Sequence, residues 1–164
     1  MAVEVRMEFG EREAQDFLEA QSASSVGKEW QLQASKVTLG AAPELWNRLV
    51  TSATNATKAY VIRVKQADGL GAELLNENNL TIQKESFPKV KLEIIRTPLA
   101  IKSSLFTMCA SLANSKTEDL PVFRFGVDSQ MQPCFTDYER ELSPQQVAHE
   151  LLKQIFEMFR KLYT

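Results

Sequence analysis

The side chain best suited to acid–base chemistry in this chain is its one histidine, His149. A histidine works as a general acid or base when a nucleophile or a group of carboxylates is placed beside it. The neighbouring sequence offers no cysteine, no serine-centred motif and no acidic cluster. His149 also falls inside a helical pattern, where a histidine at the edge of the apolar stripe can hydrogen-bond with water. We therefore predict no catalytic residue at this position.

The residues that commonly bind metals are too scattered to form a recognisable site. Cys109 and Cys134 stand alone, and neither a CxxC nor an HExxH spacing occurs. Zinc sites need such closely spaced ligands, so we predict no metal site. Both thiols are expected to be reduced, unpaired and packed in the protein. The adjacent acids Glu118 and Asp119 are best explained as part of a solvated loop.

The nearest approach to a phosphate-binding loop is the segment from Asp68 to Gly71 (DGLG). It lacks the third glycine of a dinucleotide fingerprint and the Gly-Lys-Ser/Thr ending of a P-loop, so we predict no bound cofactor. Aromatic and basic residues alternate at 60–65 and 123–125, as they do on sheets that bind single-stranded nucleic acid. An ordinary sheet gives the same alternation, and the formal net charge is −2. This balance argues against a nucleic-acid partner.

The strongest structural signal is the segment 143–164, which predicts an amphipathic helix. Ser143 can accept from the backbone N–H of Gln146, the Gln146 side chain can reach back, and Pro144 occupies a first-turn position that needs no donor. Apolar residues then recur at spacings of three and four and form one stripe. The stripe consists of Ala148, Leu152, Ile155, Phe159 and Leu162.

The apolar face of this helix is wider than the stripe a surface helix needs. One explanation is that the helix lies in a deep groove of its own domain. The other is that part of the face docks a protein partner, most simply a second copy of the chain, because exposed aromatic and methionine side chains are frequent at interfaces. On the second explanation the partner-binding residues are Leu151, Phe156, Met158, Phe159 and Tyr163.

Length and composition predict a single globular domain over residues 1–164. The hydrophobic fraction is 44% and the charged fraction is 24%, both ordinary values for a globular protein. No stretch approaches the roughly 18 apolar residues that a membrane-spanning helix needs, and the N-terminal sequence does not resemble a signal peptide. These features predict a cytoplasmic protein without a membrane span.

Hydrophobic periodicity and turn signals predict the remaining elements. Helices are expected at 10–21 and 42–54, and a third from Thr97 through a stripe formed by Ile101, Leu105, Met108 and Leu112. Strands are expected at 3–9, 60–65, 80–82, 90–94, 122–127 and 134–138, with a bent strand or small hairpin at 30–39. Loops are expected at 22–27 and 114–119. Short connections between neighbouring strands favour antiparallel pairing.

These elements predict an α+β fold, an antiparallel sheet of about five to seven strands with two to four helices and the C-terminal amphipathic helix packed on the sheet. Three functions are compatible with it. The favoured one is a non-enzymatic protein–protein interaction module, either an adaptor or a subunit of a larger assembly. The second is a small-molecule or lipid-binding domain with a cavity lined by Trp30, Trp46, Phe106 and Phe123. The third is an enzyme with a carboxylate-based site that no local motif reveals.

Overall fold

The computed structural model describes the backbone of residues 2–108 and 115–163, and the side chains from residue 9 onward within those ranges. The two α-helices are α1 (Ala2–Arg63) and α2 (Pro144–Tyr163), and a short 3-10 helix, η1 (Lys65–Ala67), follows α1. The strands are β1 (Gly71–Asn76), β2 (Asn79–Lys84), β3 (Lys89–Arg96), β4 (Ala100–Met108), β5 (Ser115–Asp119), β6 (Phe123–Val127), β7 (Pro133–Asp137) and β8 (Arg140–Leu142).

The chain divides into two compact units, Met1–Lys36 and Val37–Thr164. The first unit consists of the N-terminal part of α1. The second contains the remainder of α1 and all of the strands, together with η1 and α2. The prediction of a single domain over 1–164 is not settled by this division and stays a prediction.

The sheet of the second unit is antiparallel throughout its described pairs, in the order β1-β2-β3-β4-β6-β7-β8. Strand β4 shares one edge between two neighbours, because Ala100 and Ile101 pair with β6 whereas 104–108 pair with β5. The backbone N–H of Leu120 donates to the carbonyl of Ser103 at 3.0 Å, at the point where β4 changes partner. The sheet therefore branches at the middle of its longest strand.

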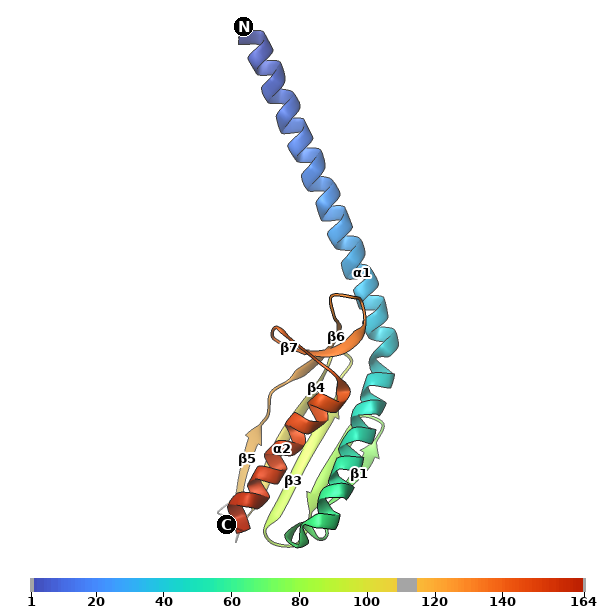
Figure 1. The fold of residues 1–164 in the computed structure, drawn as a ribbon, viewed down its shortest axis with the longest axis vertical. Helices are drawn as coiled ribbons and strands as arrows, with labels where there is room; N and C mark the ends of the chain where they lie inside the picture. Colours follow the sequence, from blue (N-terminus) through green and yellow to red (C-terminus); the bar gives the residue numbers. More distant parts are fainter. Residues whose placement is uncertain (1, 109–114, 164) are drawn as a thin grey trace. The chain divides into compact units, whose positions relative to one another are not determined.

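The core lies between one face of this sheet and two helical segments, residues 37–63 of α1 and the whole of α2 (Figure 1). The central strands place alternate residues on that face, so that Leu80 pairs with Ile94 and Leu92 with Leu105. The apolar residues of α1 that are buried against them are Ala42, Leu45, Trp46, Leu49 and Ala53. From α2 the sheet is covered by seven buried residues, Pro144, Val147, Ala148, Leu151, Leu152, Ile155 and Phe159. The predicted packing of the C-terminal helix on the sheet is confirmed.

The α+β class is also confirmed, but the prediction of five to seven strands is wrong, since eight are present among the described residues. Three short strands carry little apolar periodicity and were not predicted. In β1 the exposed sequence Glu73-Leu74-Leu75 does not alternate, β8 is three residues long, and all of β5 is exposed. Strand β5 is held by pairing with β4 alone, whereas β1 and β8 each add only one side chain, Ala72 and Leu142, to the core.

The helix predicted at 10–21 lies within α1, but the other predictions up to residue 39 are wrong. The strand at 3–9, the loop at 22–27 and the strand or hairpin at 30–39 are all α-helical and belong to α1. Glu, Gln, Arg, Lys and Ala are frequent in this segment and favour a helix, and their summed propensity outweighs the short apolar alternation. Pro43, which predicts a helix start, lies inside α1 instead. Its position next to the buried Ala42 and Leu45 shows that core packing holds the helix through the proline.

Two further segments have the opposite secondary structure to that predicted. The segment 60–65 ends a helix, and Ile62, which a strand would bury beside Tyr60, is 84% exposed. Thr97-Pro98 forms a hairpin turn, in which the Thr97 hydroxyl accepts from the N–H of Ala100 at 3.1 Å. Pro after Thr suits the second position of a β-turn as well as a helix start. Residues 109–114, which include Cys109 and Leu112, lie outside the described residues.

Candidate functional site

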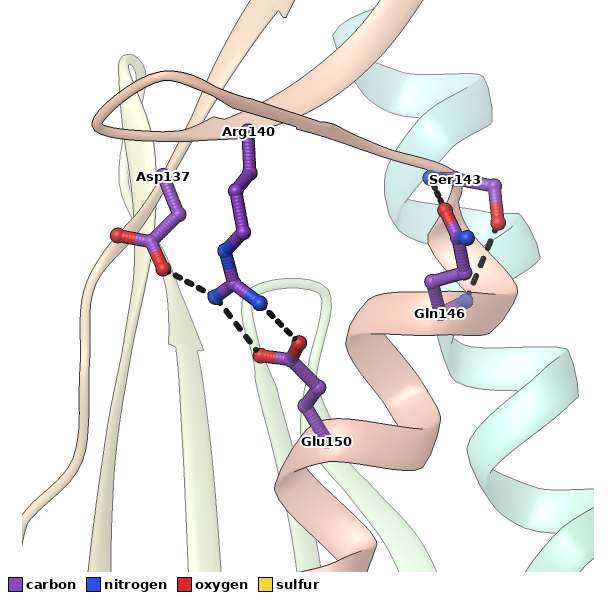
Figure 2. A network of polar contacts seen from close by, with 5 residues as sticks. All are labelled: Asp137, Arg140, Ser143, Gln146 and Glu150. Carbon is purple, nitrogen blue, oxygen red and sulfur yellow. Dashed lines mark hydrogen bonds and ion pairs between the residues drawn. The ribbon is translucent and has the colours of Figure 1, made fainter.

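The predicted partner-binding helix begins with the reciprocal cap that its sequence suggests (Figure 2). The backbone N–H of Gln146 donates to Oγ of Ser143 at 3.1 Å, and the N–H of Ser143 donates to Oε1 of Gln146 at 2.8 Å. Two donors that the helix itself leaves unpaired are thereby satisfied. This local chemistry fixes where α2 starts.

An arginine ties the β7–β8 hairpin to the first turns of α2 (Figure 2). Arg140 donates to both carboxylate oxygens of Glu150, at 2.6 and 3.2 Å, and also to the carboxylate of Asp137. The two carboxylates raise the pKa of the Arg140 guanidinium above its ordinary value, Glu150 having the larger effect. Because the cluster is exposed, it orients the hairpin more than it stabilises the fold.

Two of the five predicted partner-binding residues lie in the core of their own unit. Leu151 and Phe159 are each 2% exposed and contact the sheet side of α2. A partner cannot reach these two side chains while α2 stays packed on the sheet. The wide apolar face of α2 is therefore largely explained by the depth at which this helix is buried.

Phe156 is half-buried because it stacks on α1. Its ring lies 3.9 Å from that of Tyr60, with 11° between the planes. Burial raises the pKa of the Tyr60 hydroxyl, and the nearby charge of Arg160 opposes this shift. Met158, the next of the predicted partner-binding residues, is also half-buried and packs against the core cluster. Both side chains keep only part of their surface for contact with another molecule.

Tyr163 is the most exposed of the five, at 42%. Its hydroxyl accepts a hydrogen bond of 3.1 Å from Nζ of Lys84, an otherwise buried lysine. The same ammonium lies 5.7 Å from the centre of the Tyr163 ring and 5.9 Å from that of Phe159. These contacts hold the end of α2 against β2, while part of the Tyr163 side chain stays exposed to solvent.

Sequence reasoning missed a second apolar surface, which lies on α1 upstream of the core. Its large hydrophobic side chains are exposed, whereas most of the predicted partner-binding side chains of α2 are buried or half-buried. They are Phe9, Phe17, Leu18, Val26, Trp30, Leu32 and Leu39. The signal was present in the sequence as spacings of fourteen, seven and seven residues from Leu18 through Leu32 and Leu39 to Trp46. It shows only when the whole segment is taken as one helix.

The aromatic residues proposed to line a ligand cavity do not surround a common space. Trp46 and Phe123 are buried in the core, whereas Trp30 is exposed on α1. Phe106 borders a hollow of about 410 Å³ whose other lining residues are mostly charged or polar. Those residues are Gln83, Lys84, Glu85, Lys89, Val90 and Lys91. Nothing in this arrangement favours a lipid or a similar apolar ligand.

The residues considered for catalysis or metal binding have ordinary surroundings. His149 is exposed on α2, and Glu118 and Asp119 are exposed on β5. Cys134 is buried, and its pKa is raised first by that burial and then by the charges of Glu141 and Asp128. Over the described part of the chain, no three or more His, Cys, Asp or Glu side chains come together in a way that could hold a metal ion.

Comparison with known proteins gives no relative from which a role could be transferred. No protein family, no curated protein and no solved structure matches the chain. Among the helices of the described residues, none has both the length and the apolar character needed to cross a membrane. The functional argument therefore depends on the surfaces of the molecule itself.

Proposed function

We propose that this chain is a non-enzymatic protein–protein interaction module that works as a subunit of a larger assembly. The observation that carries the proposal is the set of exposed apolar side chains on α1. Seven large hydrophobic residues between Phe9 and Leu39 are exposed, including Leu32 at 65%. Scattered exposed leucines are common on proteins, but so many on one helical segment favour an interaction surface.

The composition of this segment gives a second argument for a partner. Gly10 and Gly27 each weaken a helix by about 1 kcal/mol relative to alanine, and Ser22, Ser24 and Ser25 weaken it further. An added Cβ at either glycine would meet no atom within 4 Å, so no contact within the described residues requires a glycine there. Helices of this kind draw most of their stability from packing of an apolar face. A partner on α1 would supply that packing.

The role predicted for α2 in partner binding is retained only for its exposed end. Phe156, Met158 and Tyr163 keep some accessible surface, whereas Leu151 and Phe159 are committed to the core. In the proposal, α1 therefore provides the main contact surface. The end of α2 is a smaller surface whose use in binding stays a prediction.

The native mass of the chain in extracts of its own cells tests this proposal. Wild-type chain is expected to migrate above its monomer mass of 18.5 kDa, and the Leu32→Glu variant is expected to lose that association. Gln33→Glu is the matched control, since it places the same charge on the neighbouring exposed position. Monomeric migration of the wild-type chain would refute the proposal, as would equal behaviour of the two variants.

A further inference from the structure

Part of the apolar sequence of α1 follows a heptad repeat, from which Phe9, Phe17, Val26 and Trp30 depart, and the folded unit shows which face that repeat defines. Counting in sevens from Tyr60 gives Ala53 and Trp46 at one position of the heptad, which we label a. Position d then falls on Ala56, Leu49 and Ala42. All six side chains are buried in the core or packed against it. Between residues 42 and 60, the a and d positions are thus the face of α1 that is covered by protein.

The same two positions continue in the sequence toward the N-terminus. Position a contains Leu39, Leu32, Ser25 and Leu18, and position d contains Ser35, Lys28, Gln21 and Ala14. We call these eight residues the α1 seam. Its three leucines are 61%, 65% and 61% exposed at positions 39, 32 and 18. Leucines seven and fourteen residues apart stay on one side of a helix that packs along another helix, so the cover that we infer for this line of leucines is a helix.

We propose that the α1 seam pairs with the α1 seam of a second copy of this chain, in a parallel two-stranded coiled coil. This inference rests on the proposed function and names the partner at that surface. In a parallel pair each a layer meets the same a layer, so that Leu18, Leu32 and Leu39 each meet their own equivalent. In an antiparallel pair an a layer meets a d layer, and these leucines would face positions that hold Gln21, Lys28 and Ser35.

The charges that flank the seam are compatible with self-association. In a parallel pair, position g of one helix lies beside position e of the next heptad in the other helix. The pairs formed in this way are Phe17 with Ser22, Ser24 with Glu29, and Gln31 with Lys36. None of them brings like charges together, and none requires a chain of different sequence. A second copy of the chain therefore satisfies the surface as well as a different partner would.

Lys28 favours two strands over three or more. It is the one charged residue of the α1 seam, and burying its charge without a partner would cost free energy. In a two-stranded coil a long lysine side chain can extend to the edge of the seam and keep its ammonium in water. Every additional helix would bury the Lys28 ammonium further and raise the cost of removing it from water, so a dimer has the lowest cost.

Sedimentation equilibrium of the purified full chain over a concentration series gives the first test. The wild-type chain is expected to reach twice the 18.5 kDa monomer mass. Leu32→Glu should raise the dissociation constant by about 100-fold or more, because both helices lose a buried leucine. The matched control is Gln33→Glu, which adds the same charge at the neighbouring exposed position but lies outside the α1 seam. It should leave the dissociation constant within about 3-fold of wild type.

Disulfide trapping tests the parallel register, with variants that keep every leucine of the seam. Made in a Cys109→Ser background, Ser25→Cys places a thiol at an a layer and should cross-link two chains under mild oxidation. Ser22→Cys, three residues away at position e, should cross-link at a rate at least about 10-fold lower. A dimer in which the two variants cross-link equally, or in which Ser25→Cys does not cross-link, would overturn the parallel seam.

The two proposals fail in different ways. If the purified wild-type chain stays at monomer mass while the complex in cell extracts is lost in Leu32→Glu, the second-copy inference is wrong and the proposed function stands. If the chain is monomeric in both settings, both are wrong. The urea midpoint of the unit 37–164 should be the same in Leu32→Glu and Gln33→Glu. A lower midpoint in Leu32→Glu alone would mean that its effect on mass came from unfolding and would count against the seam.

Discussion

Replacing Phe159 by alanine separates the two explanations of the wide apolar face of α2. Phe159 is 2% exposed, and its ring centre lies 6.2 Å from that of Tyr60 and 6.3 Å from that of Tyr163. Truncation of a buried phenylalanine costs about 3–5 kcal/mol, through lost transfer free energy and the cavity left behind. Since a domain of this size is stable by only about 5–15 kcal/mol, the loss is a large share of the total.

Urea unfolding, followed by tryptophan fluorescence, measures this loss. Trp46 is buried, and its indole N–H donates to the carbonyl of Glu77 at 2.9 Å, so that its emission should report on the core. A Trp30→Phe background removes the second tryptophan. With a slope of about 2 kcal/mol per molar urea, Phe159→Ala should lower the midpoint by roughly 1.5–2.5 M. The slope itself should change little.

Tyr163→Ala in the same background is the control at the exposed end of the helix. It removes a partly exposed ring and one hydrogen bond with Lys84, so its cost should be closer to about 1 kcal/mol. An unchanged midpoint for Phe159→Ala would refute the core position of Phe159. In that case the side chain would again be available to a partner, as the sequence pattern suggests.

Two further predictions concern groups inside the folded unit. Ser103 Oγ is buried without a hydrogen-bond partner among the described residues. Ser103→Ala should therefore leave the urea midpoint unchanged or raise it by the equivalent of about 1 kcal/mol. A clear decrease in the midpoint would show that the hydroxyl does have a hydrogen-bond partner. Folding raises the pKa of the Tyr60 hydroxyl above its unfolded value of about 10. The neutral hydroxyl therefore contributes to the free energy of unfolding below about pH 10, and this contribution should be lost as the pH rises through the folded pKa. Tyr60→Phe keeps the stack on Phe156 and should lose less stability over that interval, and parallel pH profiles of the two proteins would contradict this.

Features encoded by neighbouring residues could be predicted from the sequence. The start of α2 depends on Ser143 and Gln146, which lie three residues apart, and the same spacing is seen in the two hydrogen bonds that form there. The strands β6 and β7 were predicted as well, at 122–127 and 134–138, and they pair in the antiparallel sense that a short connection favours. In both cases, each residue that decides the structure lies within a few positions of the others.

Features decided at longer range could not be predicted in this way. The stripe of Ile101, Leu105 and Met108 has a helical spacing, yet β4 is a strand because it completes pairs with β3 on one edge and with β5 and β6 on the other. Likewise, the number of α2 side chains that become buried depends on how closely the helix packs on the sheet, and residues near α2 in the sequence do not determine this packing. The heptad of α1 was legible in the sequence, but the short apolar alternation at its start concealed it.

The order of the elements along the chain affects how the protein is made. All the strands precede α2, and α2 contributes seven of the residues that bury the inner face of the sheet. On a translating ribosome, the part of that face that α2 covers therefore stays exposed to water until residues 144–163 have left the exit tunnel. A nascent chain stalled before this point would present Leu92, Leu105 and Phe135 to chaperones as an open apolar surface.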